Sequence, residues 1–338
     1  KSALDQAYDE NGADKLLNDE AFWEKSGKAE ATRSISGKVI NYVKDSLPNL
    51  IGGSADLGPS NKTVMNEEES FSPEHPEGRN IHYGVREIGM TAIANGLLLH
   101  GGLRTYAATF FVFVDYMKPM LRLSSLMGLP MISVLTHDSI GVGEDGPTHE
   151  PVEQLTMLRA MPNMHVFRPA DETETKAAWA SALTAKRTPT CLVLSRQNLP
   201  ILEHTGKEAL KGGYVLRKET KDTADLIIIA TGSEVAVALE TAEMLEKENI
   251  SARVVSMPCM DLFAEQDEVY RQSVLPKSVT KRVVIEAGSS MSWGRYVGTE
   301  GCYVTMDGFG ASAPAAQLFE KFGFTAEQAV ERIKKELF

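Results

Sequence analysis

The sequence predicts an α/β protein made of two doubly wound domains with largely parallel sheets. Two observations support this prediction. Apolar runs of strand length alternate with helical patterns along most of the chain, which is typical of βαβ units whose parallel sheet is covered on both faces. The chain also has 338 residues, which corresponds to about two domains at ~150 residues each.

A polar, glycine-containing stretch interrupts the alternation and marks the expected domain boundary. We assign this linker to residues 201–222. The first domain is then expected at residues 31–200 and the smaller, second domain at 223–338. Residues 1–30 are charged and only weakly periodic, so we expect a linker or N-terminal extension there rather than part of a core.

The individual elements follow from the length and period of each apolar pattern. In the first domain we expect strands at 49–53, 105–111, 131–136, 165–168 and 190–195, and helices at 86–100, 116–127 and 172–186. In the second domain we expect strands at 224–230, 252–256 and 282–286, and helices through residue 248 and at 325–337. The tetrapeptide TGSE, Thr231 to Glu234, has the pattern of a capping box at the start of the first of these helices.

Composition and charge exclude several classes of function. The formal charge is −11, from 35 basic and 46 acidic residues, which argues against nucleic acid as a partner because phosphate backbones need a cationic face. No apolar run approaches the ~18 residues that a membrane helix needs, and the first residues hold no signal-peptide core. The three cysteines lie far apart without a CxxC pair, as expected for reduced thiols. We therefore expect a cytoplasmic protein without a membrane partner.

The segment HDSIGVGEDGPTHEP, residues 137–151, is the densest group of candidate functional residues. It follows a predicted buried strand, and open α/β sheets bind ligands at the carboxyl ends of their strands. The alternative is a solvated, glycine-rich loop. The segment contains GVGEDG, which matches the dinucleotide-binding pattern GxGxxG, but Glu144 and Asp145 would repel a pyrophosphate and no apolar helix follows. We reject the dinucleotide interpretation.

Glu87 begins an otherwise apolar helix. One interpretation is an acidic residue that the helix dipole favours. The other is a partly buried carboxyl that holds a proton near neutral pH and takes part in catalysis. Nearby, an aromatic run belongs either to the core or to a ring face that stacks on a planar heterocycle. The run consists of Phe110, Phe111, Phe113 and Tyr116.

Basic and hydroxyl side chains are scattered over several predicted loops. Arg33 lies in ATRSISG, Ser60 in GGSADLGPSN, and Arg196 in LSRQNLP at a strand end, as does His137. Single arginines are usually surface residues. Together, two arginines with Ser60 and His137 would form a phosphate clamp, although spacing alone does not bring them together.

Five motifs in order resemble the transketolases, which depend on thiamine diphosphate. They are GGSADLGPSN, IHYGVREIGM, THDSIGVGEDGPTHEP, FRPAD and LSRQNLP, and the resemblance runs from about residue 31 to the C-terminus. It implies a pyrimidine-binding domain followed by a smaller C-terminal domain, in a homodimer whose active site lies between two subunits. The implied activity is transfer of a two-carbon ketol group from a ketose phosphate to an aldose phosphate, a reaction of the pentose phosphate pathway.

The resemblance also implies a role for each candidate residue. Glu87 hydrogen-bonds the aminopyrimidine ring of the cofactor and is catalytic, and His149 is catalytic near the reacting carbonyl of the donor sugar. Asp145 contacts the C2 hydroxyl of the substrate. The aromatic residues that surround the cofactor are Phe113, which stacks on the pyrimidine, with Phe110 and Tyr116. The groups that hold the sugar phosphate are Arg33, Ser60, His137 and Arg196.

One family motif is absent from the sequence. Transketolases bind the diphosphate and its Mg²⁺ or Ca²⁺ through a GDG motif and a later asparagine, and the triplet from Asp307 to Phe309 is not such a motif. We therefore expect no metal ligand on this chain, and we expect the diphosphate site on an N-terminal half that belongs to the same longer chain or to a separate subunit. The sequence begins at Lys1 rather than at methionine, which agrees with this interpretation. Alone, the chain is expected to be inactive.

Several rival functions remain open at this point. The β subunit of a 2-oxo acid dehydrogenase has the same two-domain plan, and a dihydroxyacetone synthase shares nearly all of the motifs. A 1-deoxyxylulose-phosphate synthase arranges the same domains differently. The two histidines of residues 137–151 and the segment SRQNLP favour the sugar enzyme. A truncated, non-catalytic module is the alternative from another functional class.

Overall fold

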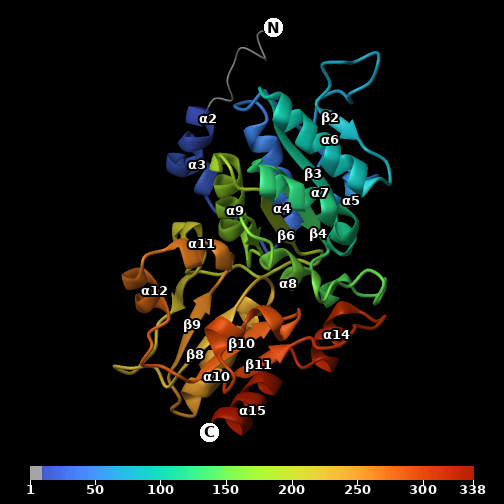
Figure 1. Ribbon diagram of the computed structural model, residues 1–338. Coiled ribbons are helices and arrows are strands. Elements are labelled where there is room, and N and C mark those ends of the chain that lie inside the picture. Colours follow the sequence, from blue (N-terminus) through green and yellow to red (C-terminus); the bar gives the residue numbers. More distant parts are fainter. Residues whose placement is uncertain (1–9) are drawn as a thin grey trace.

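The structure is a computed structural model that describes residues 10–338 (Figure 1). Residues 1–9 of the predicted N-terminal extension lie outside the described residues. Two sheets, one above the other in Figure 1, form two α/β domains that meet near the middle of the molecule. The predicted fold class is confirmed.

The first sheet has six strands in the order β2-β1-β3-β4-β6-β5, and every neighbouring pair is parallel. The strands are β1 (Leu50–Ser54), β2 (Asn80–His82), β3 (Arg104–Phe110), β4 (Ile132–Thr136), β5 (His165–Phe167) and β6 (Thr190–Leu194). The central strands β4 and β6 are buried at every position, and β3 at every position except Phe110, which explains why they appear as continuous apolar runs.

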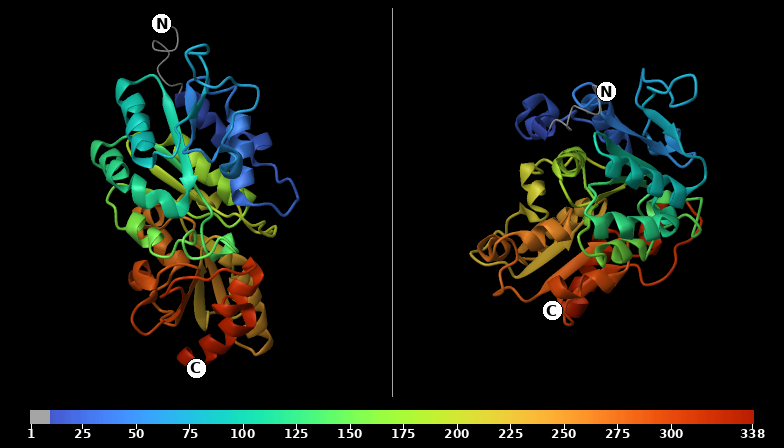
Figure 2. Two further views of the ribbon diagram at one scale, coloured as in Figure 1. Left: turned by 90° about the vertical axis from the view of Figure 1, so that its right-hand side faces the viewer. Right: turned by 45° about the horizontal axis from the view of Figure 1, so that its top comes forward.

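Helices cover both faces of this sheet because successive strand side chains point to opposite faces. Side chains of α4 (Thr32–Val43) and α9 (Glu172–Thr184) share one core with Ile132 and Val134. Side chains of α6 (Glu87–His100), α7 (Val114–Met127) and α8 (Gln154–Arg159) share the other core with Leu135. Figure 2 shows α6 and α7 on the outer side of the sheet. The short elements α5 (Gly58–Asn61), η2 (Phe111–Phe113) and η3 (Ile140–Val142) lie in the connections.

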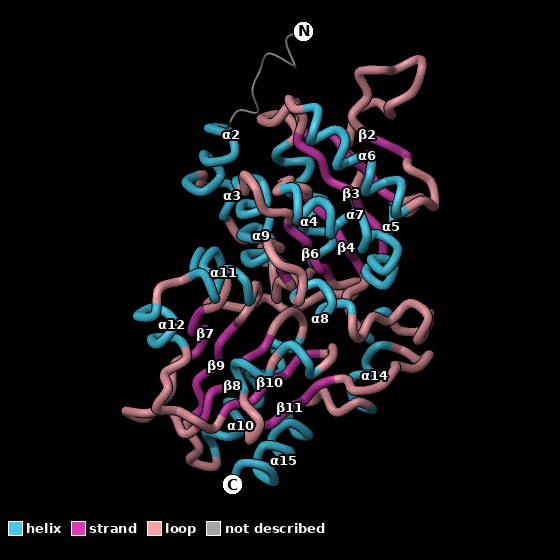
Figure 3. The backbone as a smooth tube through the Cα atoms, in the orientation of Figure 1, coloured by secondary structure: helices cyan, strands magenta, loops and turns pink. Residues whose placement is uncertain are grey.

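The second sheet has five strands in the order β11-β10-β8-β9-β7, with β7 as an antiparallel edge strand. The strands are β7 (Tyr214–Arg217), β8 (Leu226–Ala230), β9 (Ala252–Ser256), β10 (Arg282–Glu286) and β11 (Cys302–Thr305). One face packs on α10 (Glu234–Lys247) and α15 (Ala326–Leu337), and the other on α11 (Met260–Glu265), α12 (Glu268–Val274) and α13 (Gly294–Val297). The remaining helix, α14 (Ala315–Lys321), lies beside η3 of the first domain (Figure 3).

Part of the segment expected to lie outside a core is buried. Residues 10–30 contain α2 (Glu10–Lys15), η1 (Leu16–Asn18) and α3 (Glu20–Trp23). Their apolar side chains Ala13, Leu16 and Phe22 pack into the same core as α4 and α9. These few apolar residues are separated by charged ones, so they give no periodic pattern in the sequence. Similarly, residues 201–222, expected as a linker, contain η4 (Lys207–Lys211) and the strand β7.

The capping box predicted at Thr231 to Glu234 does not form. Ser233 is the N-cap residue of α10, but its side chain makes no capping hydrogen bond. The Glu234 carboxylate instead pairs with the guanidinium of Arg168, which is completely buried. A buried arginine without a carboxylate would be costly, so Glu234 stabilises the junction of the two domains rather than the helix start.

A network of buried ion pairs connects the two sheets. Arg168, which follows β5, donates from Nε to Asp138 at 2.9 Å as well as to Glu234. Arg159 donates to both oxygens of Glu286 at 2.7 and 2.8 Å. All of these side chains are buried, and the two arginines keep the pKa of Glu286 at about 2 despite the burial that would raise it. Asp138 directly follows His137, so the network reaches the segment with the densest candidate residues.

Candidate active site

The carboxyl ends of four neighbouring strands bring the candidate residues together. Ser60 follows β1, the aromatic run follows β3, His137 follows β4 and Arg196 follows β6. These strands are adjacent and parallel, so their carboxyl ends meet at one edge of the sheet. Residues that are up to 136 positions apart in sequence are thereby placed beside one another.

Arg33 and Arg196 are held together by their sequence neighbours. Thr32 and Ser195 hydrogen-bond reciprocally: the Thr32 N–H donates to Ser195 Oγ at 3.0 Å, and the Ser195 N–H donates to Thr32 Oγ1 at 2.7 Å. This pair attaches the start of α4 to the end of β6. Arg33 also donates from Nη1 to the backbone carbonyl of Ser60 at 2.8 Å. Three of the four groups predicted for phosphate binding therefore share one place.

The Arg33 guanidinium is half-buried and has no counter-charge within the described part of the chain. Burial, with the positive charge of Arg196, lowers its pKa. Its Nε is a buried donor that lacks a hydrogen-bond partner among the described residues. Arg196 itself is exposed. Two adjacent cations with a free buried donor form a local anion site in an acidic protein.

His137 is the fourth member of this group. Its backbone has φ +66°, the left-handed region that few residues other than glycine adopt. His137 Nδ1 lies 2.8 Å from Thr136 Oγ1, which donates to Asn61 Oδ1 at 2.7 Å, and His137 Nε2 lies 3.5 Å from Arg33 Nη1. Because the Thr136 hydroxyl donates its proton to Asn61, it must accept a hydrogen bond from His137. These two hydrogen bonds therefore place the proton of the His137 ring on Nδ1.

The protonation of His137 follows from its surroundings. Burial and the charges of Arg33, Arg196 and His149 lower the pKa of His137 to about 3. The imidazole is therefore neutral at physiological pH, with an unprotonated Nε2 that faces Arg33. The strained backbone and the two ring contacts hold this nitrogen at the anion site.

The aromatic residues continue from His137 away from the arginines. The rings of Phe110 and His137 are stacked with centroids 3.7 Å apart, and Phe110 and Phe113 are parallel at 6.1 Å. The ring of His149 meets that of Phe113 edge-on with centroids 5.5 Å apart, and the Tyr116 ring is tilted against that of Phe113 at 6.3 Å. Phe111, by contrast, is fully buried in the core. Phe113 is half-buried and Tyr116 is exposed, so this set offers ring surface for a planar ligand.

Glu87 and Asp145 occupy different positions from these residues. Glu87 is the first residue of α6 and is only 9% exposed, and its carbonyl accepts from Thr91. Asp145 is exposed in the turn between Gly143 and Gly146. No hydrogen bond or ion pair within residues 10–338 connects either carboxylate to the other candidates. Their roles stay predictions.

The segment that carries Asp145 and His149 rests on the C-terminal domain. Ser312 Oγ donates to the Glu144 carbonyl at 2.5 Å. Glu150 is buried against Gly310 and Ala311, and burial, partly offset by the Ala311 N–H, raises its pKa to about 7. The GVGEDG motif forms the short helix η3 and a turn, and the next helix begins only at Gln154, so it lacks the strand–turn–helix context of a dinucleotide site.

Sequence reasoning missed the polar residues that support the site. Thr32, Asn61, Thr136 and Ser195 are buried and hold the candidates in place, and the only signal was their position beside the motif residues. Gln197 also lies in the quoted motif LSRQNLP. Its side-chain amide is buried beside Gly141, and both polar atoms lack a partner among the described residues.

Within the described residues, neither a metal-binding cluster nor a membrane-spanning helix is found. No three His, Cys, Asp or Glu side chains in residues 10–338 are grouped in a way that could hold a metal ion. Over the same residues, none of the helices has the length and apolar character needed to cross a membrane.

Comparison with known families gives two matches that together span most of the chain. Residues 28–201 match the family described as "Transketolase, pyrimidine binding domain", and residues 212–325 match the "Transketolase-like TK C-terminal domain". A transketolase from Halalkalibacterium halodurans is 54% identical over 312 residues, which cover 91% of this chain and 47% of the relative. The chain therefore spans about half the length of this relative.

Two solved structures are similar to the whole arrangement. A transketolase from Pichia stipitis in complex with sedoheptulose-7-phosphate has a TM-score of 0.88 and 44% identity, over 92% of this chain and 46% of that one. A split-gene transketolase described as an inactive beta4 tetramer has a TM-score of 0.73 and 27% identity. In that case the match covers 91% of this chain and 98% of the other.

Proposed function

We propose that this chain, which belongs to the transketolase family, supplies the pyrimidine-binding half of a thiamine-diphosphate-dependent enzyme that transfers ketol groups between sugar phosphates. The observation that carries the proposal is the convergence of Arg33, His137 and Arg196 beside a stack of aromatic rings. An anion site next to a face for a planar ring suits a phosphorylated substrate and a heterocyclic cofactor together.

The anion site holds the phosphate of the sugar. The exposed Arg196 and the free Nε of Arg33 donate to phosphate oxygens, and Ser60 lies beside Arg33. A bound phosphate offsets the charges of Arg33 and Arg196, which together with burial lower the pKa of His137. The pKa of His137 then rises, and a proton taken up at Nε2 lets the ring donate to the phosphate.

The aromatic set and Glu87 fit the aminopyrimidine end of thiamine diphosphate. Phe113, with Phe110 and Tyr116 beside it, presents partly exposed ring surface, and Glu87 presents a carboxyl at the first turn of α6. When bound, the cofactor supplies the carbon atom that carries the two-carbon unit. Glu87 holds and exchanges a proton with the pyrimidine ring, and the aromatic rings orient that ring and exclude water.

His149 and Asp145 act on the sugar rather than on its phosphate. His149 lies edge-on to Phe113, and its Nδ1 is 2.9 Å from Thr148 Oγ1, which leaves Nε2 for the substrate. We assign to Nε2 the proton transfer at the donor carbonyl oxygen. The exposed carboxylate of Asp145 accepts a hydrogen bond from a sugar hydroxyl.

The diphosphate and its Mg²⁺ are held by another part of the enzyme, because this sequence has no GDG motif and matches only 47% of the Halalkalibacterium halodurans relative. The docking face for that part, or for a second copy in a homodimer, is the outer side of α6 and α7. These helices pack side by side, yet Leu99 is 60% and Leu126 71% exposed, with Ile88 and Ile93 also exposed. Several large apolar side chains exposed on two adjacent helices are typical of an interface.

The test is ketol transfer from xylulose 5-phosphate to ribose 5-phosphate in the presence of thiamine diphosphate and Mg²⁺. The chain is assayed alone and after addition of the N-terminal half of a transketolase relative, with complex formation checked by size-exclusion chromatography. We expect activity only in the mixture. The description of the similar split-gene protein as an inactive tetramer agrees with this expectation. No activity in a complex that forms would contradict the proposal and favour a 2-oxo acid or non-catalytic role.

A further inference from the structure

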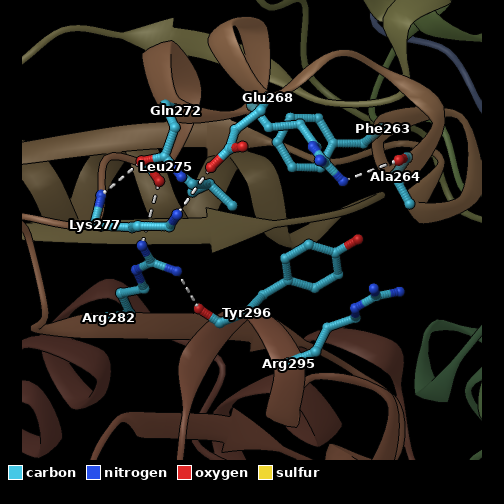
Figure 4. A pocket seen from close by; sticks show the side chains of 10 residues that line it. Phe263, Ala264, Glu268, Gln272, Leu275, Lys277, Arg282, Arg295 and Tyr296 are labelled. Carbon is cyan, nitrogen blue, oxygen red and sulfur yellow. Dashed lines mark hydrogen bonds and ion pairs between the residues drawn. The ribbon is translucent and has the colours of Figure 1, made fainter.

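A cavity lies in the C-terminal domain, between α11, α12, the start of β10 and α13. It encloses about 370 Å³, within the range of small-molecule sites. Its lining combines Phe263, Leu275 and Tyr296 with a ring of charged side chains (Figure 4). It shares no residue with the candidate active site, and in Figure 1 α12 lies on the opposite side of the molecule from α14.

Most of the charged side chains that line this cavity are positive. Four cations, Arg271, Lys277, Arg282 and Arg295, line it with a single carboxylate, Glu268. Lys277 donates to Glu268 at 2.9 Å, and both side chains are more than half exposed, so this pair is weak and leaves the cavity open. The three arginines form no ion pair with any described residue. In a chain with a net charge of −11, this cavity has four cations against one carboxylate, and the local excess of positive charge favours an anion.

The Arg282 guanidinium is fixed in position by backbone carbonyls rather than by a carboxylate. It donates from Nη1 to the Tyr296 carbonyl at 2.8 Å and from Nη2 to the carbonyls of Leu275 and Pro276 at 3.3 and 3.1 Å. Burial without a counter-ion lowers its pKa. Arg33 shows the same combination of half-burial and lowered pKa in the candidate phosphate site. A bound anion would stabilise both charges.

The apolar part of the lining indicates more than an inorganic ion. The rings of Phe263 and Tyr296 lie 6.0 Å apart, and Arg295 lies over the Tyr296 ring at 5.7 Å. Figure 4 shows the Tyr296 ring between Arg282 and Arg295. The volume also exceeds the need of a single phosphate. From this geometry we propose that the cavity binds a small organic molecule carrying a phosphate group, whose charge meets the arginines while its apolar part lies on the aromatic wall.

The proposal is tested by titration calorimetry with adenosine 5′-monophosphate as the probe and adenosine as the uncharged control. The full chain carries Arg33→Ala and Arg196→Ala, so that the candidate active site does not contribute to binding. We expect saturable binding of the monophosphate with a dissociation constant below about 1 mM, and none of adenosine.

Two pairs of substitutions locate the binding. Lys277→Ala with Arg295→Ala removes two exposed cations from the cavity and spares Arg282, which the fold uses. Lys247→Ala with Lys335→Ala removes the same charge from exposed positions on α10 and α15. The first pair should weaken binding at least about tenfold, the loss expected for one charged hydrogen bond, and the second should leave it within about twofold. The proposal is overturned if both pairs weaken binding equally or if the first pair has no effect. It is also overturned if binding is not saturated by 10 mM adenosine 5′-monophosphate, which is roughly tenfold above the expected dissociation constant. Because no activity is measured, the outcome is independent of the proposed function.

Discussion

Replacement of Arg168 by alanine tests whether the buried ion network stabilises the junction of the two domains. The guanidinium is completely buried and donates to Asp138 at 2.9 Å, to the Thr231 carbonyl and hydroxyl at 3.1 Å, and to Glu234. Alanine would leave the carboxylates of Asp138 and Glu234, which are 3% and 0% exposed, without their partner. Removing one partner of a buried ion pair costs about 3–5 kcal/mol. This is a large share of the ~5–15 kcal/mol that a typical domain has.

Urea denaturation of the full chain measures this loss, with the slope of the transition checked so that the comparison remains one of free energies of unfolding. Arg332→Ala is the matched control, because Arg332 pairs with Glu336 on the surface of α15 and its loss should cost under about 1 kcal/mol. Adding Glu234→Gln to Arg168→Ala should recover part of the loss, since one unpaired charge is removed. If Arg168→Ala costs no more than Arg332→Ala, the network does not stabilise the junction.

Three further predictions concern the candidate site and its support. Glu87→Ala should lower kcat of the completed enzyme at least ~10²-fold with saturating cofactor, the lower range for loss of an acid–base group, and near-normal turnover would remove Glu87 from its proposed role. Arg196→Ala should raise KM for phosphorylated sugars with little change in kcat; an equal rise for unphosphorylated acceptors would contradict the clamp. Because Glu150 has a pKa raised to about 7, the folded state binds more protons than the unfolded state between about pH 4.5 and 7. The free energy of unfolding should therefore fall as pH rises through that window, and Glu150→Gln should flatten the slope, whereas an unchanged slope would assign the dependence to other groups.

The sequence predicts the interior of both sheets and the edge strand β5, but it misses the edge strands β2, β7 and β11. Strands β4, β6 and β8 are buried at every position and therefore appear as continuous apolar runs. The edge strands β7 and β11 alternate between buried and half-buried residues over four positions, too few for a period-2 signal to stand out. The missed edge strands did not affect the choice of candidate site residues. Those residues were identified from the resemblance of the motifs, which does not depend on knowing the strands and helices that carry them.

Spacing alone did not predict how the phosphate clamp assembles. Arg33 and Arg196 are brought together by the Thr32–Ser195 hydrogen bonds, which join positions 163 residues apart. Neither threonine nor serine is distinctive in a sequence. The exposed apolar residues of α6 were missed for a different reason. This helix is apolar around most of its circumference, and such a helix is usually buried within its own domain. Only the structure distinguishes a face that is covered from one that is exposed.

The C-terminal domain contains no candidate site residue, but its contacts hold in place a segment of the first domain that carries several of them. Three contacts anchor residues 137–151 to that domain: Asp138 through Arg168 to Glu234, Glu144 through Ser312, and Glu150 against Ala311. They lie at the start, middle and end of the segment. His137 is next to the first contact, and His149 is next to the last. A glycine-rich loop between two candidate site histidines has high conformational entropy when free. Contacts along its length with a second domain reduce that freedom before substrate binds, which lowers the entropic cost of bringing both histidines to the sugar at once.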